Sequence, residues 1–369
     1  MVPFIDLKRF EVGFLDTWAD TIFKMTKGAE FIGGPQIKTL EDKLQNFCKV
    51  SFAITCANGT DAIQLCLRAA GVGPGDEVIV PDMTFWATFE AVVNVGSTPI
   101  TVDISLADGG IDFEAFRLAI QTQKPKAAII AHLYGWGSAN LNEIRQTCRE
   151  NGVLLIEDGA QCFGASWNNE PIYSSALIAT TSFYPAKVLG AAGDAGAVLT
   201  SDKALAEKVR SLANHGRSSH YSYENVGWNS RMDSLQAAYL NLSFEHLNSR
   251  IKSRRLSSDY YRKNIKSSDL TFMKIPKGYE ENGYCNVLII DNKDLKHSLE
   301  LALKRAGIGF GNIYPSTLSE QPCTSRYSCS HFGGGNARKL SESVLNLPLF
   351  PYMTQTELRH VVEVINQLA

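Results

Sequence analysis

The sequence lacks several features that mark whole classes of protein. Its eight cysteines form no C-x-x-C pair, which argues against a disulfide framework and against a structural zinc site. No window approaches about 18 uninterrupted apolar residues, so we expect no membrane span. The chain does not open with a basic start and a long apolar stretch, so we expect no signal peptide. Lys and Arg number 36 against 38 Asp and Glu, a net charge of −2 that gives no electrostatic reason to bind nucleic acid or an anionic membrane. These absences predict a cytoplasmic protein of a reducing compartment that binds no metal.

The remaining composition is that of a globular protein, with 44% apolar and 20% charged residues in a chain of 369. Between about residues 50 and 200, short apolar runs alternate with longer amphipathic segments. The runs cover residues 51–56, 77–80, 98–102, 127–130 and 153–156. Because these runs are apolar at nearly every position, they predict strands buried on both faces. The pattern therefore predicts an α/β domain with a largely parallel sheet.

The pattern changes after about residue 234. Residues 235–247 and 250–266 predict one long helix or two successive helices, a common route from a core sheet into a second domain. A strand over 284–290 and helices over 295–306 and 356–368 follow. We place the boundary near residue 250, which gives a large domain of residues 1–250 and a small domain of residues 251–369.

Three segments carry polar residues where strands are expected to end, and an open parallel sheet binds its ligands there. The first, residues 56–61, combines a tight turn at Gly59 with the start of a helix. Free backbone N–H groups at that start and the Thr60 hydroxyl could seat a phosphate. The alternative is an ordinary strand-to-helix junction in which Thr60 or Asp61 caps the helix.

The second segment, residues 154–161, is an apolar strand that ends in Glu157 and Asp158. A carboxylate at this edge can hold a cationic ring nitrogen or a metal. The alternative is that Asp158 caps the next helix.

The third segment, residues 180–196, places Lys187 among apolar residues and glycines. Desolvation disfavours the charged form of a lysine, so its amine becomes nucleophilic toward carbonyls and can form a Schiff base. Ser182 lies five residues earlier, close enough to share one site. The alternative is a surface lysine beside a glycine-rich loop.

Together the three segments fit pyridoxal 5′-phosphate (PLP). This cofactor needs a lysine for the imine, a carboxylate at the pyridinium nitrogen, a phosphate seat and a flat side chain against the ring. Phe85 is the candidate for stacking on the ring, with a core aromatic as the alternative.

The sequence resembles the DegT/DnrJ/EryC1/StrS family of PLP-dependent nucleotide-sugar aminotransferases over almost its whole length. Six ordered motifs carry the resemblance, at residues 57–62 (ANGTDA), 73–81 (GPGDEVIVP), 157–161 (EDGAQ), 182–190 (SFYPAKVLG), 214–217 (NHGR) and 229–233 (NSRMD). The resemblance implies the fold type I architecture of PLP-dependent transferases. Its large domain surrounds a mixed, mostly parallel seven-stranded sheet, and a smaller α/β domain lies at the carboxyl terminus.

The same resemblance implies roles for individual residues. Lys187 would form the Schiff base, Asp158 would pair with the pyridine nitrogen, and Gln161 and Phe85 would lie against the two faces of the ring. The phosphate would be held by Gly59, Thr60 and Ser182.

The family places its active sites at a homodimer interface, so two subunits would share each site. Asn229 would reach the phosphate of the neighbouring subunit. Residues near the substrate or the interface would be His215, Arg231 and Tyr314.

Departures from the family pattern bear on the substrate. Ala195 stands where glycine is frequent, which is a mild change, and Trp136 stands where glutamine is common. Phe350 and Tyr352 replace two histidines near the carboxyl terminus. We expect these changes to fall where a sugar nucleotide binds, so they warn against assigning a substrate by analogy.

The implied activity is transfer of an amino group from an amino acid, expected to be glutamate, to a keto group of a nucleotide-linked sugar. Residues 3–8 and 56–61 resemble members that act on 3-keto sugars, UDP- or dTDP-linked hexoses for lipopolysaccharide or other surface glycans. A 4-keto sugar is the alternative within aminotransfer. PLP-dependent sugar dehydration is a second alternative, but family dehydratases carry histidine where Lys187 stands. A non-catalytic regulatory relative is the third, which the joint presence of Lys187, Asp158, Gln161 and Ser182 disfavours.

Overall fold

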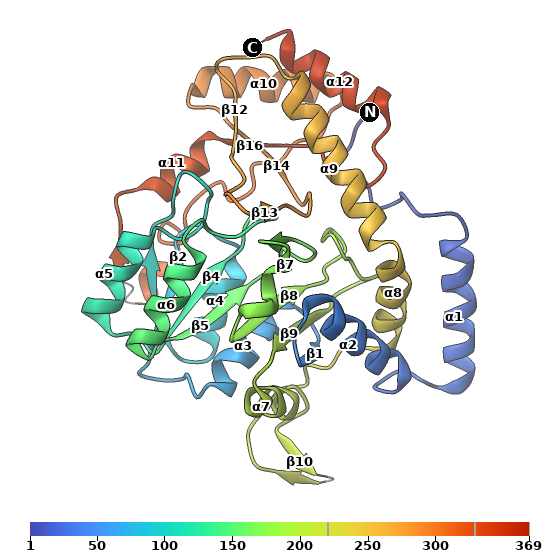
Figure 1. The fold of residues 1–369 in the computed structure, drawn as a ribbon, viewed down its shortest axis with the longest axis vertical. Helices are drawn as coiled ribbons and strands as arrows, with labels where there is room; N and C mark the ends of the chain where they lie inside the picture. The colour runs from blue at the N-terminus through green and yellow to red at the C-terminus, as the bar shows by residue number, and fades with distance from the viewer. Residues whose placement is uncertain (220, 328–329, 369) are drawn as a thin grey trace.

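A mixed eight-stranded sheet forms the centre of the structure (Figure 1). The computed structural model describes residues 1–219, 221–327 and 330–368. Its central strands are ordered β1 (Phe52–Cys56), β9 (Gly196–Thr200), β8 (Ile178–Ser182), β5 (Leu154–Asp158), β4 (Ala127–Ala131), β2 (Glu77–Pro81), β3 (Thr98–Val102) and β15 (His331–Phe332). β9 runs antiparallel to both of its neighbours, and the remaining strand pairs of this sheet are parallel. The expected seven-stranded, mostly parallel sheet is confirmed, and the two-residue β15 extends it at one edge.

Helices cover both faces of this sheet, which explains why its strands are apolar without alternation. Along β4, Ala127 and Ile129 pack into a cluster with α3 (Gly59–Ala69), α4 (Trp86–Asn94) and α7 (Lys203–Ala213). Their neighbours Ala128 and Ile130 pack into a larger cluster on the opposite face. That face is covered by α2 (Pro35–Cys48), α5 (Phe113–Gln123), α6 (Leu141–Asn151) and α8 (Ser234–Glu245). Successive side chains of a strand point to opposite faces, so a strand covered on both sides is apolar at every position.

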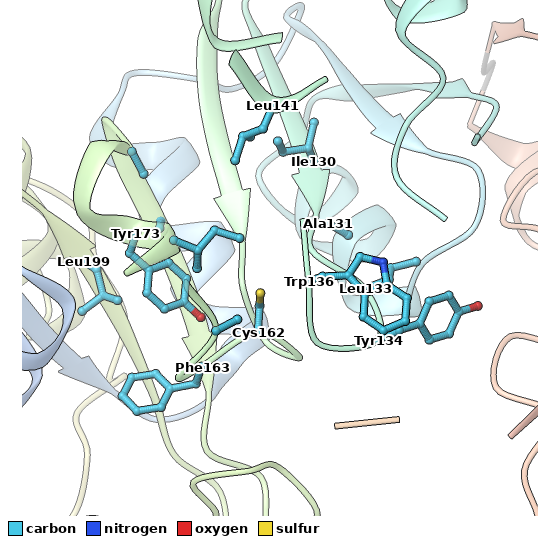
Figure 2. Packing of buried hydrophobic residues seen from close by; sticks show 14 of the residues in the cluster. Ile130, Ala131, Leu133, Tyr134, Trp136, Leu141, Cys162, Phe163, Tyr173 and Leu199 are labelled. Carbon is cyan, nitrogen blue, oxygen red and sulfur yellow. The ribbon is translucent and has the colours of Figure 1, made fainter. Parts of the chain in front are cut away.

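The larger cluster continues past the carboxyl end of β4 and contains several aromatic side chains (Figure 2). Trp136 is 1% exposed there, and its indole N–H donates to the carbonyl of Asp108 at 3.0 Å. Phe163 and Tyr173 pack in the same cluster. A packed core therefore supports the turns at the carboxyl edge of the sheet.

A second, smaller layer lies at the end of α9 (Leu247–Asn264), which runs from α8 toward α10 (Lys293–Arg305) and α12 (Gln355–Asn366) (Figure 1). Its antiparallel sheet contains β12 (Thr271–Phe272), β14 (Asn286–Ile289) and β16 (Val344–Leu347). These elements bury a separate apolar cluster that also takes in Val2. The expected helices and strand of this part are present, and the region 235–266 forms two successive helices. The expected boundary at residue 250 falls inside α9 and stays a prediction.

The other elements are peripheral to these two layers. They are α1 (Phe14–Gly28), α11 (Asn336–Ser343), the 3-10 helices η1 (Ile172–Ser175) and η2 (Thr324–Arg326), the hairpin β10 (Arg217–Ser219) and β11 (Ser222–Tyr223), and the small sheet of β6 (Ser166–Trp167), β7 (Glu170–Pro171) and β13 (Tyr279–Glu280). Within the described residues, no helix is both long and apolar enough to cross a membrane.

Candidate active site

A cavity of about 570 Å³ opens at the carboxyl edge of the central sheet. Its walls come from the turns that follow β1, β2, β4, β5 and β8, and from residues near 284 and 313 of the carboxy-terminal part. Eight of the residues predicted for the site line it: Gly59, Thr60, Phe85, Asp158, Gln161, Ser182, Lys187 and Tyr314. The structure therefore brings together segments that are more than 200 residues apart in the chain.

The turn between β1 and α3 combines a helix start with a close backbone approach. The Asn58 side chain caps α3 by accepting a hydrogen bond from the Asp61 N–H at 2.8 Å, so neither Thr60 nor Asp61 is the cap. A Cβ at Gly59 would lie 2.8 Å from the Cβ of Ser182, so only glycine fits against that serine. The free N–H groups of the first helical turn and two hydroxyls, those of Thr60 and Ser182, thus line one end of the cavity. Such a cluster of donors suits a phosphate.

Two successive carboxylates at the end of β5 point to different environments. Glu157 is 1% exposed and receives two hydrogen bonds from the Arg145 guanidinium, at 2.7 and 2.8 Å. The His132 ring also lies 3.0 Å from Glu157. Burial alone would raise the pKa of Glu157, but hydrogen bonds from His132 and Arg145 bring it below its ordinary value. Glu157 is therefore a structural residue with its charge compensated by the protein.

Asp158 lines the cavity and has weaker partners. Its carboxylate accepts a hydrogen bond from the Ala160 N–H at 3.0 Å and one from the Thr88 hydroxyl at 3.4 Å. No helix begins at the turn that follows, so Asp158 is not a helix cap. Burial raises the pKa of this carboxyl above its ordinary value, although the Ala160 N–H and the nearby Lys187 amine oppose the shift. A cation inside the cavity would supply the compensation that the protein itself leaves incomplete.

Lys187 extends into the same cavity from the turn after β8. Its Nζ lies 3.3 Å from the hydroxyl of Tyr284. Burial lowers the pKa of the Lys187 amine, while the charge of Asp158 opposes that shift. The lysine is thus a cavity residue and not a surface lysine, and the lowered pKa increases the share of the neutral, nucleophilic amine.

The side chains expected to flank a flat ring hold defined positions. The Gln161 carbonyl oxygen accepts a hydrogen bond from the Tyr134 N–H at 2.7 Å, and its amide nitrogen donates to the Tyr314 hydroxyl. Phe85 precedes α4 and is 63% exposed, which excludes the alternative of a core aromatic. An apolar ring this exposed at a cavity wall is available to stack against a ligand.

Three predicted residues lie outside this cavity. Asn229 is exposed and pairs through its backbone with Asn214. His215 is exposed, with its N–H donating to the Trp228 carbonyl at 2.8 Å. The Arg231 guanidinium donates to the Asn214 side chain at 2.7 Å. These residues form a polar surface outside the cavity of their own chain. They could contact a ligand only in the cavity of another subunit.

Sequence reasoning missed several lining residues, of which His132 and Tyr284 matter most. His132 directly follows the apolar strand β4, so its position at a strand end was a usable signal. Tyr284 is 97 residues from Lys187 in the chain, and no local pattern links the two.

The expectation that the departures from the family pattern fall at the substrate is wrong for two of them. Trp136 is 1% exposed in the large core, and Phe350 is fully buried in the small one. The Tyr352 hydroxyl donates to Glu11 at 2.7 Å, and the residue is likewise absent from the cavity wall. The side chains of Trp136 and Phe350 fill core space and do not face a ligand.

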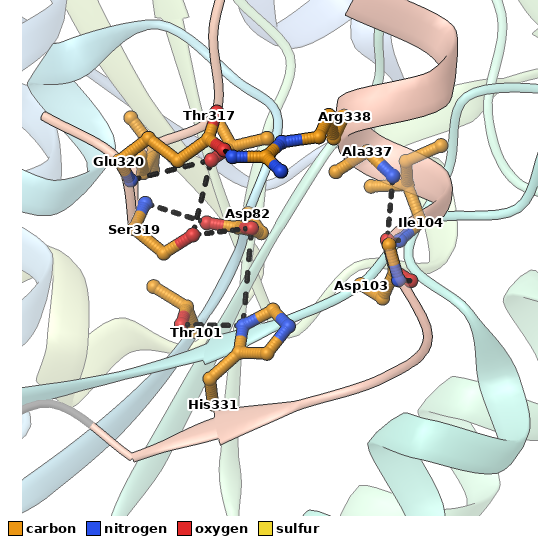
Figure 3. Close-up of polar contacts among 12 residues, drawn as sticks. Asp82, Thr101, Asp103, Ile104, Thr317, Ser319, Glu320, His331, Ala337 and Arg338 are labelled. Carbon is orange, nitrogen blue, oxygen red and sulfur yellow. Dashed lines mark hydrogen bonds and ion pairs between the residues drawn. The ribbon is translucent and has the colours of Figure 1, made fainter.

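Two aspartates fasten the carboxy-terminal part of the chain to the sheet (Figure 3). Asp82, which follows β2, accepts hydrogen bonds from the N–H and the hydroxyl of Ser319 at 2.7 and 2.8 Å. Asp103, which follows β3, accepts five backbone N–H groups at 2.7–2.9 Å, those of Ile104, Gly334, Gly335, Asn336 and Ala337. The carboxy-terminal part is thereby held over the strand ends and completes the cavity.

A family model agrees with this geometry. The model of the DegT/DnrJ/EryC1/StrS aminotransferase family matches residues 17–366. The chain belongs to this family.

Individual members are similar over nearly the full length of both chains. The UDP-N-acetyl-3-dehydro-alpha-D-glucosamine 3-aminotransferase of Acidithiobacillus ferrooxidans is 36% identical over 366 residues, 99% of this chain and 97% of the relative. The UDP-2-acetamido-2-deoxy-3-oxo-D-glucuronate aminotransferase of Pseudomonas aeruginosa is 35% identical over 97% of this chain and 98% of its own. The solved structure of S. venezuelae DesV in complex with a ketimine intermediate superposes with a TM-score of 0.93 at 30% identity, covering 99% of this chain and 98% of that one.

This aminotransferase of the DegT/DnrJ/EryC1/StrS family uses PLP, and its cavity fits the cofactor. The buried Asp158 carboxylate lacks a full counter-charge, as a partner for a protonated ring nitrogen requires. Groups that could donate to a phosphate lie at the β1–α3 turn and at Ser182, and the amine of Lys187 reaches the same cavity. The cavity therefore offers a carboxylate for the ring nitrogen of PLP, hydrogen-bond donors for its phosphate and an amine for its aldehyde.

Proposed function

We propose that this enzyme transfers the amino group of glutamate to the 3-keto group of a UDP- or dTDP-linked hexose, for lipopolysaccharide or another surface glycan. The observation that carries the proposal is the cavity that joins Lys187, Asp158 and the phosphate donors at the strand ends. The two relatives described above support the 3-keto position, because both are named for 3-keto UDP sugars and align over nearly their whole length.

The roles of the chain's own residues follow from the geometry. When bound, PLP supplies a ring that stabilises the negative charge left after a proton departs from the donor's α-carbon. Asp158 keeps the ring nitrogen protonated, because a buried carboxylate strongly favours a cationic partner. The Nζ of Lys187 would move a proton between the substrate carbon and a carbon of the cofactor. In the first half-reaction the proton would pass from the donor's α-carbon to the cofactor, and in the second from the cofactor to the sugar carbon. Donor and acceptor thus use the site in turn, and the enzyme follows ping-pong kinetics.

Cavity residues also fix where the ligand lies. Ser182, Thr60 and the N–H groups at Gly59 would hold the phosphate, and Phe85 and Gln161 would lie against the ring; all of these residues line the cavity. Tyr314 is the substrate-side residue in this chain, with its hydroxyl held by Gln161.

A second copy of the chain completes the site in this proposal. Asn229, His215 and Arg231 lie outside the chain's own cavity, where a two-fold partner could use them. Trp228 is only partly buried, with the Arg68 guanidinium 5.7 Å from its ring. Apolar side chains are exposed in and beside α1, among them Val12, Leu15, Phe23, Phe31 and Ile32. A dimer interface would remove such surface from water.

A substrate panel tests the proposal. The purified enzyme is given glutamate and, in separate reactions, 3-keto and 4-keto hexoses linked to UDP or dTDP, and the 2-oxoglutarate formed is measured. We expect the highest kcat/KM with a 3-keto sugar and an amine at C3 of the product by NMR. A higher kcat/KM with a 4-keto sugar would establish the alternative position. A dehydrated product without an amine would establish the dehydratase alternative.

A further inference from the structure

Tyr284 is the hydrogen-bond partner of the reactive amine. Its hydroxyl oxygen lies 3.3 Å from Lys187 Nζ, and the same nitrogen lies 5.0 Å from the centre of its ring. Both the hydroxyl oxygen and the ring face are regions of negative potential that attract an ammonium group. Tyr284 thus contacts the atom that gains and loses the proton.

The segment around Tyr284 is fixed at several points. Asn282 is fully buried, and its amide donates to the carbonyls of Gln161 and Phe163, both at 2.9 Å. Its carbonyl oxygen accepts the N–H of Tyr284 at 2.9 Å. Gly283 has a φ of 70°, and a Cβ there would lie 2.5 Å from the Cβ of Arg254. The tyrosine therefore belongs to a rigid bridge between the carboxy-terminal part and the turn after β5.

The other groups near the Lys187 amine are less able to accept a hydrogen bond from its ammonium form. Asp158 attracts the ammonium form, but its carboxylate is also the partner of the ring nitrogen in the proposed function. Cys285 is buried, and burial raises the pKa of its thiol, so it stays neutral at physiological pH. His132 faces Asp158 and is paired with Glu157. Among these groups of the described chain, Tyr284 is the one whose oxygen lies within hydrogen-bond distance of Nζ.

We propose that Tyr284 is a positioning residue for Lys187. Its hydroxyl oxygen accepts a hydrogen bond from the ammonium form of Lys187 and so keeps the proton on Nζ while the proton passes between the donor's α-carbon and the cofactor carbon. The inference rests on the proposed role of Lys187 as the proton carrier. When the donor's α-carbon loses its proton, the lone pair of Nζ forms the new N–H bond and the amine becomes an ammonium. Tyr284 keeps its own proton throughout, and burial raises the pKa of its hydroxyl, which disfavours its ionisation. The hydroxyl oxygen and the ring of Tyr284 stabilise the ammonium form of Lys187 until its proton passes to the cofactor carbon.

The test is Tyr284→Phe in the holoenzyme, since phenylalanine keeps the ring and removes only the hydroxyl. With the cofactor converted to its amine form by glutamate, the Lys187 amine is free, and brief acetic anhydride pulses at a series of pH values label it. Mass spectrometry of the Lys187 peptide, normalised to the exposed Lys203, gives the labelling midpoint. We expect the midpoint to fall by about one pH unit, the size expected for loss of a hydrogen bond to a charged group. The single-turnover rate with glutamate should fall about tenfold, with KM for glutamate unchanged.

Tyr279→Phe is the matched control. Tyr279 is buried and lies outside the cavity, and the variant likewise loses one hydrogen bond, 3.0 Å to the Ser138 carbonyl. It should leave both the midpoint and the rate unchanged. An unchanged midpoint in Tyr284→Phe, or an equal shift in Tyr279→Phe, overturns the inference. Failure of the proposed function is distinguishable: Lys187 of the wild type would then be labelled equally with the cofactor in its aldehyde and its amine forms.

Discussion

Asp158 and Glu157 are neighbours on one strand, and removing the charge of each should have opposite effects on stability. In Asp158→Asn the new side chain has the same shape and can still accept the Ala160 N–H. The change removes a buried carboxylate whose pKa is raised by burial. A raised pKa means that the folded state disfavours the ionised form. This carboxylate therefore lowers the stability of the protein as the pH rises above the pKa that the carboxyl has in the unfolded chain. Asp158→Asn should therefore raise the Tm of the cofactor-free protein at neutral pH.

Glu157→Gln should do the reverse. His132 and Arg145 hold the pKa of Glu157 below its ordinary value. The stability that this carboxylate contributes is therefore fully present above its pKa in the unfolded chain, and it is lost as the pH falls through its pKa in the folded protein. Removing one partner of a buried ion pair typically costs about 3–5 kcal/mol, since the Arg145 guanidinium is left without its counter-charge. Glu157→Gln should thus lower the Tm at pH 7, with the difference from wild type shrinking in acid.

Catalysis separates the two residues further. A partner of the ring nitrogen contributes most when negative charge enters the ring, and loss of such a buried pair, again about 3–5 kcal/mol, corresponds to roughly 10²- to 10⁴-fold in rate. The stopped-flow half-reaction with glutamate should slow by that factor in Asp158→Asn, although the variant still binds PLP. The reasoning is refuted if Asp158→Asn lowers the cofactor-free Tm as Glu157→Gln does, or if its half-reaction proceeds at the wild-type rate.

Three further predictions concern the same site. Lys187→Ala should fold with an unchanged circular dichroism spectrum but show no turnover, and near wild-type activity would exclude it as the catalytic lysine. Gly59→Ala should weaken PLP binding about 10- to 100-fold in a fluorescence titration, because overpacking against Ser182 costs about 1–3 kcal/mol; Gly73→Ala, with its nearest atom at 3.8 Å, is the control. Mixing Lys187→Ala with Asn229→Ala subunits should restore activity, because one site of the mixed dimer then carries both lesions and the other neither; no recovery despite confirmed heterodimers would refute a shared site.

Much of the site could be predicted from the sequence because its residues sit at strand ends. Uninterrupted apolar runs fix where a doubly covered strand ends, and in parallel strands those ends meet at one edge. Asp158 closes such a run at the end of β5. Ser182 ends β8, whose sequence IATTS is not an uninterrupted apolar run, so the signal for Ser182 and Lys187 is a lysine among apolar residues and glycines. Choosing between a helix cap and a cofactor ligand required coordinates, which show Asn58 in the capping position.

What could not be predicted depends on long-range packing. Tyr284 and Tyr314 belong to the carboxy-terminal part, which Asn282, Asp82 and Asp103 help to fasten to the strand ends. Nothing in the periodicity of a sequence encodes such contacts. The departure at Trp136 shows the same limit, since a buried indole and one facing a ligand look alike in a sequence.

The site also departs from the rules that stabilise the rest of the fold. Two ionisable groups, Asp158 and Lys187, are placed in one cavity, and burial shifts the pKa of each toward its neutral form. The amine contacts the Tyr284 hydroxyl, and the carboxylate contacts an N–H and a hydroxyl, so each has a weaker partner than Arg145 provides for Glu157. A protein under selection for stability alone would replace such a pair with apolar residues. The incomplete compensation leaves the carboxylate available to a ring nitrogen and the amine available to a carbonyl, and this availability is what PLP chemistry requires of the two residues.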